Sequence, residues 1–281
     1  MSLVVFAAVL AAACLHALWN AMAKGGSDKL VSMAAIVSGH VPVAVLLAAY
    51  LPMPVPESWP YIAASMGLHV GYQYCLLRSY RIGDLTQVYP IARGIAPLIV
   101  ALVSILFLGV ALSLPEMIAI ALIGSGIVSL GLVRSKTGLR NPAATAFAIT
   151  TGCFIAAYSL NDGTGARLSG EPIAFYAWAS LGNALIFLAG IRILAPGTLS
   201  RMRREAGRTL VIGANASFLA YAIVVWAFTE APIALVTALR ETSILFALLI
   251  GVFVLKERLD LAKVISTFVT IAGAALLRVS K

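Results

Sequence analysis

Three charged side chains lie inside otherwise uncharged stretches of the sequence, and their types are suited to binding an anion. Arg93 and Arg240 each lie several residues into an apolar run, and Glu241 follows Arg240 directly. At a rise of roughly 1.5 Å per residue, a helix would bury both guanidinium groups about 10–12 Å below a membrane surface. A charge at that depth costs roughly 2.5–3.5 kcal/mol and therefore needs a reason. Because guanidinium binds carboxylate or phosphonate oxygens in a fork, two facing arginines predict an anion clamp.

Glu241 is the one acidic residue that we expect deep in a span, and its role has three interpretations. It could hold the ammonium group of a zwitterionic substrate, bind a coupling proton, or pair structurally with an arginine. Neighbouring residues on a helix point about 100° apart, which makes a pair with Arg240 awkward. We therefore expect Arg93 to be the partner of Glu241.

Other polar and aromatic side chains within the apolar runs are candidates to line a substrate cavity. His16 and Asn20, like His69 and Gln73, are four residues apart, so each pair shares one helical face. For any single Tyr or Trp, packing or a place at the membrane interface is the more common alternative. Beside the three charged residues, the predicted substrate-binding residues are His16, Trp19, Asn20, His69, Tyr72, Tyr89, Tyr158, Trp178, Asn215 and Tyr221.

The stretch around Arg93 also contains Pro90, Gly94 and Pro97. Proline removes a backbone donor and strains the preceding helical turn. An unwound or kinked stretch that lines a cavity is one interpretation, and a packing kink without ligand contact is the other.

The elements that must position these residues are membrane-spanning helices. Hydrophobic residues make up 61% of the 281, charged residues only 11%, and the mean hydropathy is +0.99, outside the range of soluble domains. Long apolar runs without alternation predict helices and not a β-barrel. We expect an all-α membrane protein with ten transmembrane helices. They would form around the charge-free stretches 1–23, 30–56, 58–77, 94–115, 117–133, 141–161, 172–191, 209–229, 242–255 and 264–277, and the fourth and ninth helices would begin far enough upstream to include Arg93, Arg240 and Glu241.

The two halves of the sequence resemble each other weakly. A shift of 147 residues brings Arg93 onto Arg240 and Gly126 onto Gly273. Each half would contain five spans, and because five is odd, the second half would enter the membrane from the opposite side. The prediction is two inverted five-helix repeats, residues 1–140 and 141–281, with a substrate site near the midplane between them.

Two segments give the sequence a family resemblance. Residues 89–98 read YPIARGIAPL, and residues 256–259 read KERL before a final helix that contains Gly273. In these segments the chain resembles the drug/metabolite transporter superfamily, EamA family, although the first half has Val110, Ala111 and Leu112 where a second Glu-Arg-Leu element would be expected. The segment LHALWN at 15–20 is similar to EamA-type proteins associated with phosphonate utilisation. The resemblance implies a metabolite transporter that works by alternating access.

The basic residues indicate an orientation and do not indicate a nucleic-acid partner. The net charge is +9, but Lys and Arg lie in connectors and form no basic face. The odd-numbered connectors hold 14 of them, whereas the even-numbered connectors and the termini hold three. The positive-inside rule then places both termini on the non-cytoplasmic side of the cell's inner (cytoplasmic) membrane.

These observations predict a secondary transporter for a small anionic or zwitterionic metabolite, such as an amino acid or a phosphonate. Its partners would be the substrate, the lipid bilayer and, as one coupling ion, protons; both a monomer and a homodimer stay open. The alternatives are a membrane receptor or scaffold and an intramembrane enzyme. The sequence has no HExxH, GxSxG or Walker A pattern, so we expect no catalytic activity, cofactor or metal.

Overall fold

The computed structural model describes residues 1–26, 28–83, 85–133, 141–253 and 261–279. Within these residues all regular structure is helical, so the all-α class is confirmed. The α-helices are α1 (Leu3–Gly25), α2 (Lys29–Tyr50), α3 (Trp59–Ile82), α4 (Leu85–Leu106), α5 (Leu114–Val133), α6 (Pro142–Leu168), α7 (Pro172–Leu194), α8 (Thr198–Glu205), α9 (Ala214–Glu230), α10 (Ile233–Arg240), α11 (Ser243–Phe253) and α12 (Leu261–Val279). A 3₁₀ turn, η1 (Pro56–Ser58), precedes α3, and one π-helical turn, η2 (Thr209–Gly213), precedes α9.

The chain is a multi-pass membrane protein. Seven helical segments of the described residues are long and apolar enough to cross a bilayer: α1, α2, α4, α6, α7, η2 with α9, and α10 with α11. Two shorter apolar helices run over Leu114–Leu130 and Val264–Val279. α3 has 24 residues, but His69, Gln73, Arg78 and Arg81 make it more polar. The expected number of ten spans stays a prediction.

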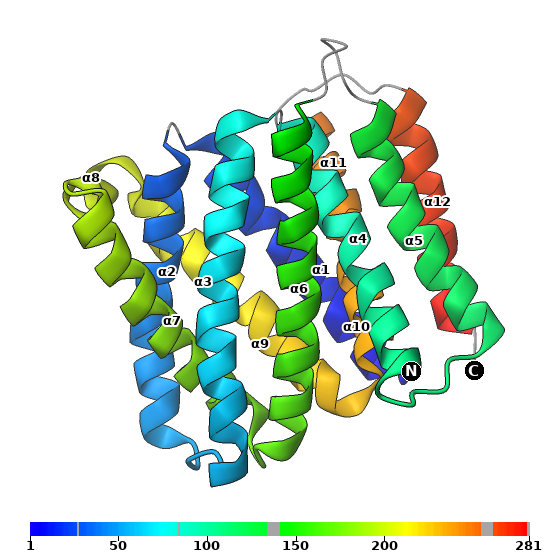
Figure 1. Ribbon diagram of the computed structural model, residues 1–281, viewed down its shortest axis with the longest axis horizontal. Coiled ribbons are helices and arrows are strands. Elements are labelled where there is room, and N and C mark those ends of the chain that lie inside the picture. The colour runs from blue at the N-terminus through cyan, green and yellow to red at the C-terminus, as the bar shows by residue number, and fades with distance from the viewer. Residues whose placement is uncertain (27, 84, 134–140, 254–260, 280–281) are drawn as a thin grey trace.

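Helices from the two halves of the chain pack against each other. α1 begins and α12 ends at the same end of the molecule (Figure 1). α3 packs on α6 and α1 on α9, while α2 packs on α7 and α5 on α12. Such packing of first-half helices on second-half helices agrees with an inverted repeat, but the repeat itself stays a prediction.

The helix that carries Arg240 is broken in the middle of its span, whereas α4 is not. α10 and α11 are separated by Glu241 and Thr242, where Thr242 N donates to Leu239 O at 3.0 Å and Thr242 Oγ1 donates to the same oxygen at 2.7 Å. α4 runs as one helix through Pro90 and Pro97. The unwinding that we considered for α4 is therefore not observed. The irregular backbone instead lies beside Glu241, and the side chain of Thr242 satisfies the Leu239 carbonyl that the break exposes.

Two glycines let α4 approach α5 closely. A Cβ atom added at Gly94 would lie 2.7 Å from the carbonyl oxygen of Gly124, and one added at Gly124 would lie 2.9 Å from that of Gly94. Small residues at such a crossing allow backbone contact between membrane helices. This contact fixes α4 at the residue next to Arg93.

Some sequence predictions fall outside the described residues. The KERL segment at 256–259 is one of them. The basic residues of the connector at 134–140, which contribute to the predicted orientation, also lie outside the described residues.

Candidate functional site

A cavity of about 80 Å³ lies between helices of both halves. It is bordered by α1, α2 and α3 from the first half and by α6, α7 and α9 from the second. Six of the predicted binding residues line this central cavity: His16, Trp19, His69, Tyr72, Tyr158 and Tyr221. Its lining is aromatic and polar, which suits a small molecule that carries hydrogen-bonding groups.

Tyr158 organises the aromatic wall of the central cavity. Its ring stacks on His69 with 4.4 Å between centroids, and it meets Tyr72 and Tyr221 edge to face at 5.6 and 5.7 Å. Tyr176 of α7 packs in the same way against Tyr221, at 5.2 Å. Such edge-to-face contacts each add about 0.5–1.5 kcal/mol beyond burial. The wall is therefore a connected aromatic cluster contributed by α3, α6, α7 and α9.

The three charged residues meet in one buried cluster. Arg93 Nε lies 2.6 Å from Glu241 Oε2, and Arg240 Nη2 lies 3.4 Å from Glu241 Oε1. The Arg93 contact is an ion pair without hydrogen-bond alignment, and Arg93 Nη2 also donates to Ser243 Oγ at 3.4 Å. One carboxylate thus serves two guanidinium groups, and the three side chains together carry one excess positive charge.

The contact between Arg240 and Glu241 differs from our expectation. Adjacent residues on a continuous helix point apart, but α10 ends at Arg240 and Glu241 lies in the turn before α11. The break changes the relative direction of the two side chains, so both arginines reach the same carboxylate. The expected pair between Arg93 and Glu241 is present as well.

The charged cluster reaches the central cavity through two tyrosines. The guanidinium carbon of Arg240 lies 5.9 Å from the ring centroids of both Tyr158 and Tyr221. Both rings line the cavity, whereas Arg93, Arg240 and Glu241 do not. A buried cation–π contact contributes up to about 2 kcal/mol. Arg240 is therefore held directly behind the aromatic wall.

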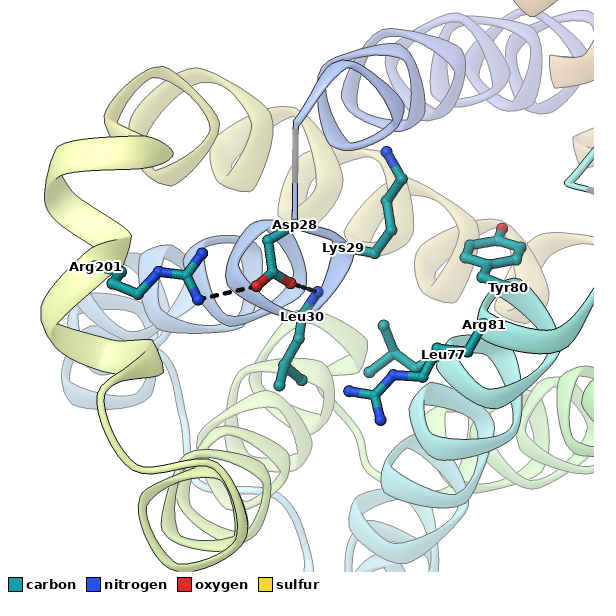
Figure 2. A pocket seen from close by; sticks show the side chains of 7 residues that line it. All are labelled: Asp28, Lys29, Leu30, Leu77, Tyr80, Arg81 and Arg201. Atoms are coloured by element: carbon teal, nitrogen blue, oxygen red, sulfur yellow. Dashed lines mark hydrogen bonds and ion pairs between the residues drawn. The ribbon is translucent and has the colours of Figure 1, made fainter.

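A second pocket, of about 380 Å³, opens at the end of the molecule where α2 begins and α3 ends (Figure 2). Lys29, Arg81 and Arg201 contribute three cationic side chains to it, and Asp28 one carboxylate. Asp28 Oδ2 accepts from Arg201 Nη1 at 3.0 Å, and Asp28 Oδ1 accepts from the backbone N of Leu30 at 2.9 Å. The contact between Asp28 and Arg201 in this basic pocket holds α8 against the start of α2.

The environment of Asp28 favours its charged form. Partial burial by itself would raise the pKa of Asp28, but the backbone N–H groups of Val31 and Leu30 and the Arg201 guanidinium outweigh burial. The net result is a pKa below the usual value of an aspartate.

Sequence comparison relates the second half of the chain to a known family. The model of the EamA-like transporter family matches residues 143–279. The second half of the chain is therefore similar to the EamA-like transporters. The family expected from the sequence is thus confirmed, but the phosphonate-associated subgroup is not. No curated protein matches the chain.

Structure comparison extends over the whole chain. A solved structure described only as "Crystal structure of protein" has a TM-score of 0.76 at 19% sequence identity. The match covers 98% of this chain and 99% of the other chain. At this identity the likeness shows the fold alone, and that fold includes the first half, to which the EamA match does not extend.

Besides the three charged residues, four more of the predicted binding residues do not line the central cavity. Asn20 Nδ2 donates to His16 O within α1, and Asn215 is exposed, with its Nδ2 bonded to Val211 O of the preceding turn. Trp178 packs against Trp59 of α3. Tyr89 precedes Arg93 by about one turn of α4 and is absent from the cavity lining. Side-chain direction, which spacing alone did not fix, accounts for these positions.

Asp162 is the main residue that the sequence analysis missed. It lies inside α6 and is 1% exposed, so our expectation that Glu241 is the only deep acidic residue is wrong. Its Oδ2 accepts from Tyr221 Oη at 2.8 Å, and its Oδ1 accepts from Asn161 Nδ2 at 3.0 Å. The charge-free run ends at Asn161, so Asp162 looked like the start of a connector. Helical spacing from Tyr158, four residues earlier, was the available signal.

Gln73, which the spacing from His69 indicated, borders the cavity, as do Asn183 and His40, which were not predicted as binding residues. Gln73 on α3 and Asn183 on α7 exchange two hydrogen bonds, of 3.1 and 3.2 Å. His40 lies close to Ser180, and its Nε2 is buried without a hydrogen-bond partner. Among the described residues, no group of three His, Cys, Asp or Glu side chains is arranged to bind a metal ion.

Proposed function

We propose that the chain is a secondary transporter that carries a small anionic or zwitterionic metabolite, such as an amino acid or a phosphonate, by alternating access. Similarity to a transporter family supports the general activity. The substrate class is argued from the charges around the cavity. The proposed site comprises the central cavity together with the charged cluster of Arg93, Arg240 and Glu241.

The observation that carries this proposal is the sharing of one buried carboxylate by two buried arginines. Arg93, Arg240 and Glu241 are each at most 3% exposed, so water screens their charges very little. The excess positive charge favours an anion nearby, and Arg240 lies directly behind Tyr158 and Tyr221. A shift of these rings would let a carboxylate or phosphonate in the cavity reach the guanidinium fork.

A buried carboxylate that shares Tyr221 with Arg240 supports a zwitterion as one form of the substrate. Asp162 accepts a hydrogen bond from Tyr221, whose ring also contacts Arg240. A positive cluster and a buried carboxylate thus both adjoin the aromatic wall. An amino acid or an aminophosphonate carries the same two charges a few bonds apart.

The packing of the helices supports transport by relative movement of two halves, residues 1–140 and 141–281. Each of α1, α2 and α3 packs on a helix of the second half, and the cavity lies among them. Inverted halves rock around a fixed midplane site in other secondary transporters, and we propose the same motion for this chain. We propose the cytoplasmic membrane as the location, with both termini on the non-cytoplasmic side. The basic pocket would then face the cytoplasm and attract anions toward the cavity.

The proposal is tested by ligand binding to the purified protein in nanodiscs. A panel of carboxylates, phosphonates and zwitterions is screened by thermal unfolding, since a ligand at 100 times its dissociation constant adds about 2.7 kcal/mol. A hit should lose its effect in Arg240→Gln and be weakened in Arg240→Lys, which keeps the charge without the fork. Arg203→Gln, on the exposed face of α8, is the matched control and should retain binding.

Transport is then measured as counterflow of the hit in proteoliposomes. Counterflow without chemical change of the substrate supports a transporter and excludes an intramembrane enzyme acting on it. Binding without counterflow would favour a receptor. A panel in which no anion or zwitterion stabilises the wild type would contradict the proposed substrate class.

A further inference from the structure

His69 on α3 and Asp162 on α6 face each other at the wall of the central cavity. His69 Nε2 lies 3.9 Å from Asp162 Oδ2. The imidazole is 19% exposed, whereas the carboxylate is 1% exposed. A proton in the cavity can thus reach the imidazole, which in turn lies next to a carboxylate removed from solvent.

The second ring nitrogen of His69, Nδ1, has its partners on Ser65. His69 Nδ1 lies 3.0 Å from the backbone oxygen of Ser65, and the Ser65 hydroxyl lies 3.3 Å from the same nitrogen. In the tautomer with hydrogen on Nδ1, the ring donates to that backbone oxygen, and Nε2 is the basic nitrogen. Nε2 is also the nitrogen that faces Asp162.

Tyr221 Oη and Asn161 Nδ2 already donate to the two oxygens of Asp162. A proton on Nε2 would make the 3.9 Å approach of His69 to Asp162 Oδ2 an ion pair. From this geometry we infer that His69 and Asp162 form a proton-binding site, coupled to anion binding at Arg240; the coupling rests on the proposed function.

The coupling follows from rings that the two sites share. Tyr158 stacks on His69, and Tyr221 meets His69 edge to face at 5.5 Å. The guanidinium of Arg240 lies 5.9 Å from the centroids of the same two rings. The positive charge of Arg240 opposes a second positive charge on His69, and a bound anion removes that opposition. Anion and proton should therefore bind together, each strengthening the other.

Other titratable groups surround His69. Those facing it across the cavity or the aromatic wall are His16 on α1, His40 on α2, Tyr72 on α3, Tyr158 on α6, Tyr176 on α7 and Tyr221 on α9. Arg93 and Glu241 stand behind this wall with Arg240. Among the ion pairs of the described residues, Asp162 takes part only in the one with His69, and that pair is ionic only when the imidazole is protonated.

The proton site is tested without any substrate, by NMR of protein labelled in its histidine rings and held in nanodiscs. The chain has three histidines, so His69→Gln assigns one resonance, and His16→Gln is the control that leaves it in place. The ring resonances are followed from about pH 8 to about pH 5, and we expect the neutral His69 ring to gain a proton on acidification. Asp162→Asn should make this protonation require a more acidic solution. A ring that stays neutral throughout, or that is indifferent to Asp162→Asn, overturns the inference.

The coupling is tested with L-lactate and glycine as probes, because their carboxylates stay ionised in this range. Wild-type affinity for the probe that binds should rise about fivefold or more from about pH 8 to about pH 6, and His69→Gln should abolish the change. Binding that does not depend on pH overturns the coupling while leaving the proposed function intact. If neither probe nor any other anion binds, the proposed function fails, and the NMR titration alone decides the proton site.

Discussion

Arg93 and Glu241, which are 148 positions apart in the sequence, form a buried ion pair with 2.6 Å between Nε and Oε2. Arg240 shares the same carboxylate. Because the carboxylate is shared, the buried charge that remains after a substitution depends on which of the three side chains is removed. Removing Arg93 leaves one cation with one anion, whereas removing Glu241 leaves two buried cations.

Replacing the shared carboxylate should therefore be the most damaging change in the cluster. We expect Glu241→Gln to lower the free energy of unfolding by about 3–5 kcal/mol, because two guanidinium groups stay buried without a counter-charge. Arg93→Gln should cost less, and Arg93→Gln combined with Glu241→Gln should recover part of the loss. Thermal unfolding in nanodiscs measures the order. A smaller loss for Glu241→Gln than for Arg93→Gln would contradict the shared carboxylate.

The paired amides of Gln73 and Asn183 connect α3 to α7 beside the central cavity. Asn183→Leu should cost about 1–3 kcal/mol, because it leaves the Gln73 amide buried without its partner. Gln73→Leu should have a similar effect. The double variant should cost clearly less than the sum, giving a coupling energy of about 0.5–3 kcal/mol in a double-mutant cycle. Strict additivity would show that the two amides do not depend on each other.

The close contact between α4 and α5 depends on the absence of a side chain at Gly94. In Gly94→Ala the new methyl group would meet the Gly124 carbonyl, so we expect a loss of about 1–3 kcal/mol and weaker ligand binding through the neighbouring Arg93. Gly190→Ala in α7 is the matched control, because no atom lies within 4 Å of a Cβ added there. That substitution should be neutral or stabilising. Equal melting temperatures for the two variants would exclude the proposed tight contact.

Pairing across the halves could be predicted from the sequence, because it depends on residue type and depth. An arginine inside an apolar run needs an acidic partner, and Glu241 was the acidic residue at matching depth. The ion pair with Arg93 has that form. The all-α class followed in the same way from composition and the lack of alternation.

The positions that could not be predicted depend on where each helix ends and on which of its faces points toward the cavity. Asp162 looked like the edge of a connector because a charge-free run ends before it, but α6 continues to Leu168. Asn215 and Tyr221 lie on one helix, yet a separation of six residues turns their side chains about 120° apart. Only Tyr221 reaches the cavity. No proline in the sequence marks the break after Arg240, so the break could not be predicted. The break allows Arg240 to contact Glu241 as well.

The contact between Asp28 and Arg201 should make the stability of this end of the molecule depend on acid. The pKa of Asp28 is lowered in the folded protein, so its ion pair stabilises the fold above the unfolded-state pKa of about 3.9 and is lost as the pH falls through the folded value. Both side chains are more than one-third exposed, so the effect should be below about 1 kcal/mol. Asp28→Asn keeps a residue that caps α2 but removes the charge.

Melting temperatures of wild type and Asp28→Asn should therefore differ at about pH 6 and converge as the pH falls below the lowered pKa of Asp28. Glu205 also has a lowered pKa, because Arg201 hydrogen-bonds to it, so the variant should keep part of the acid sensitivity. Glu57→Gln, at an exposed position of η1, is the control and should follow the wild type. A constant difference at every pH would mean that Asp28 acts through its cap to α2 and not through its charge. In that case α8 would be held to the start of α2 without help from this ion pair, and the basic pocket would owe its shape to the packing of α8 on α2.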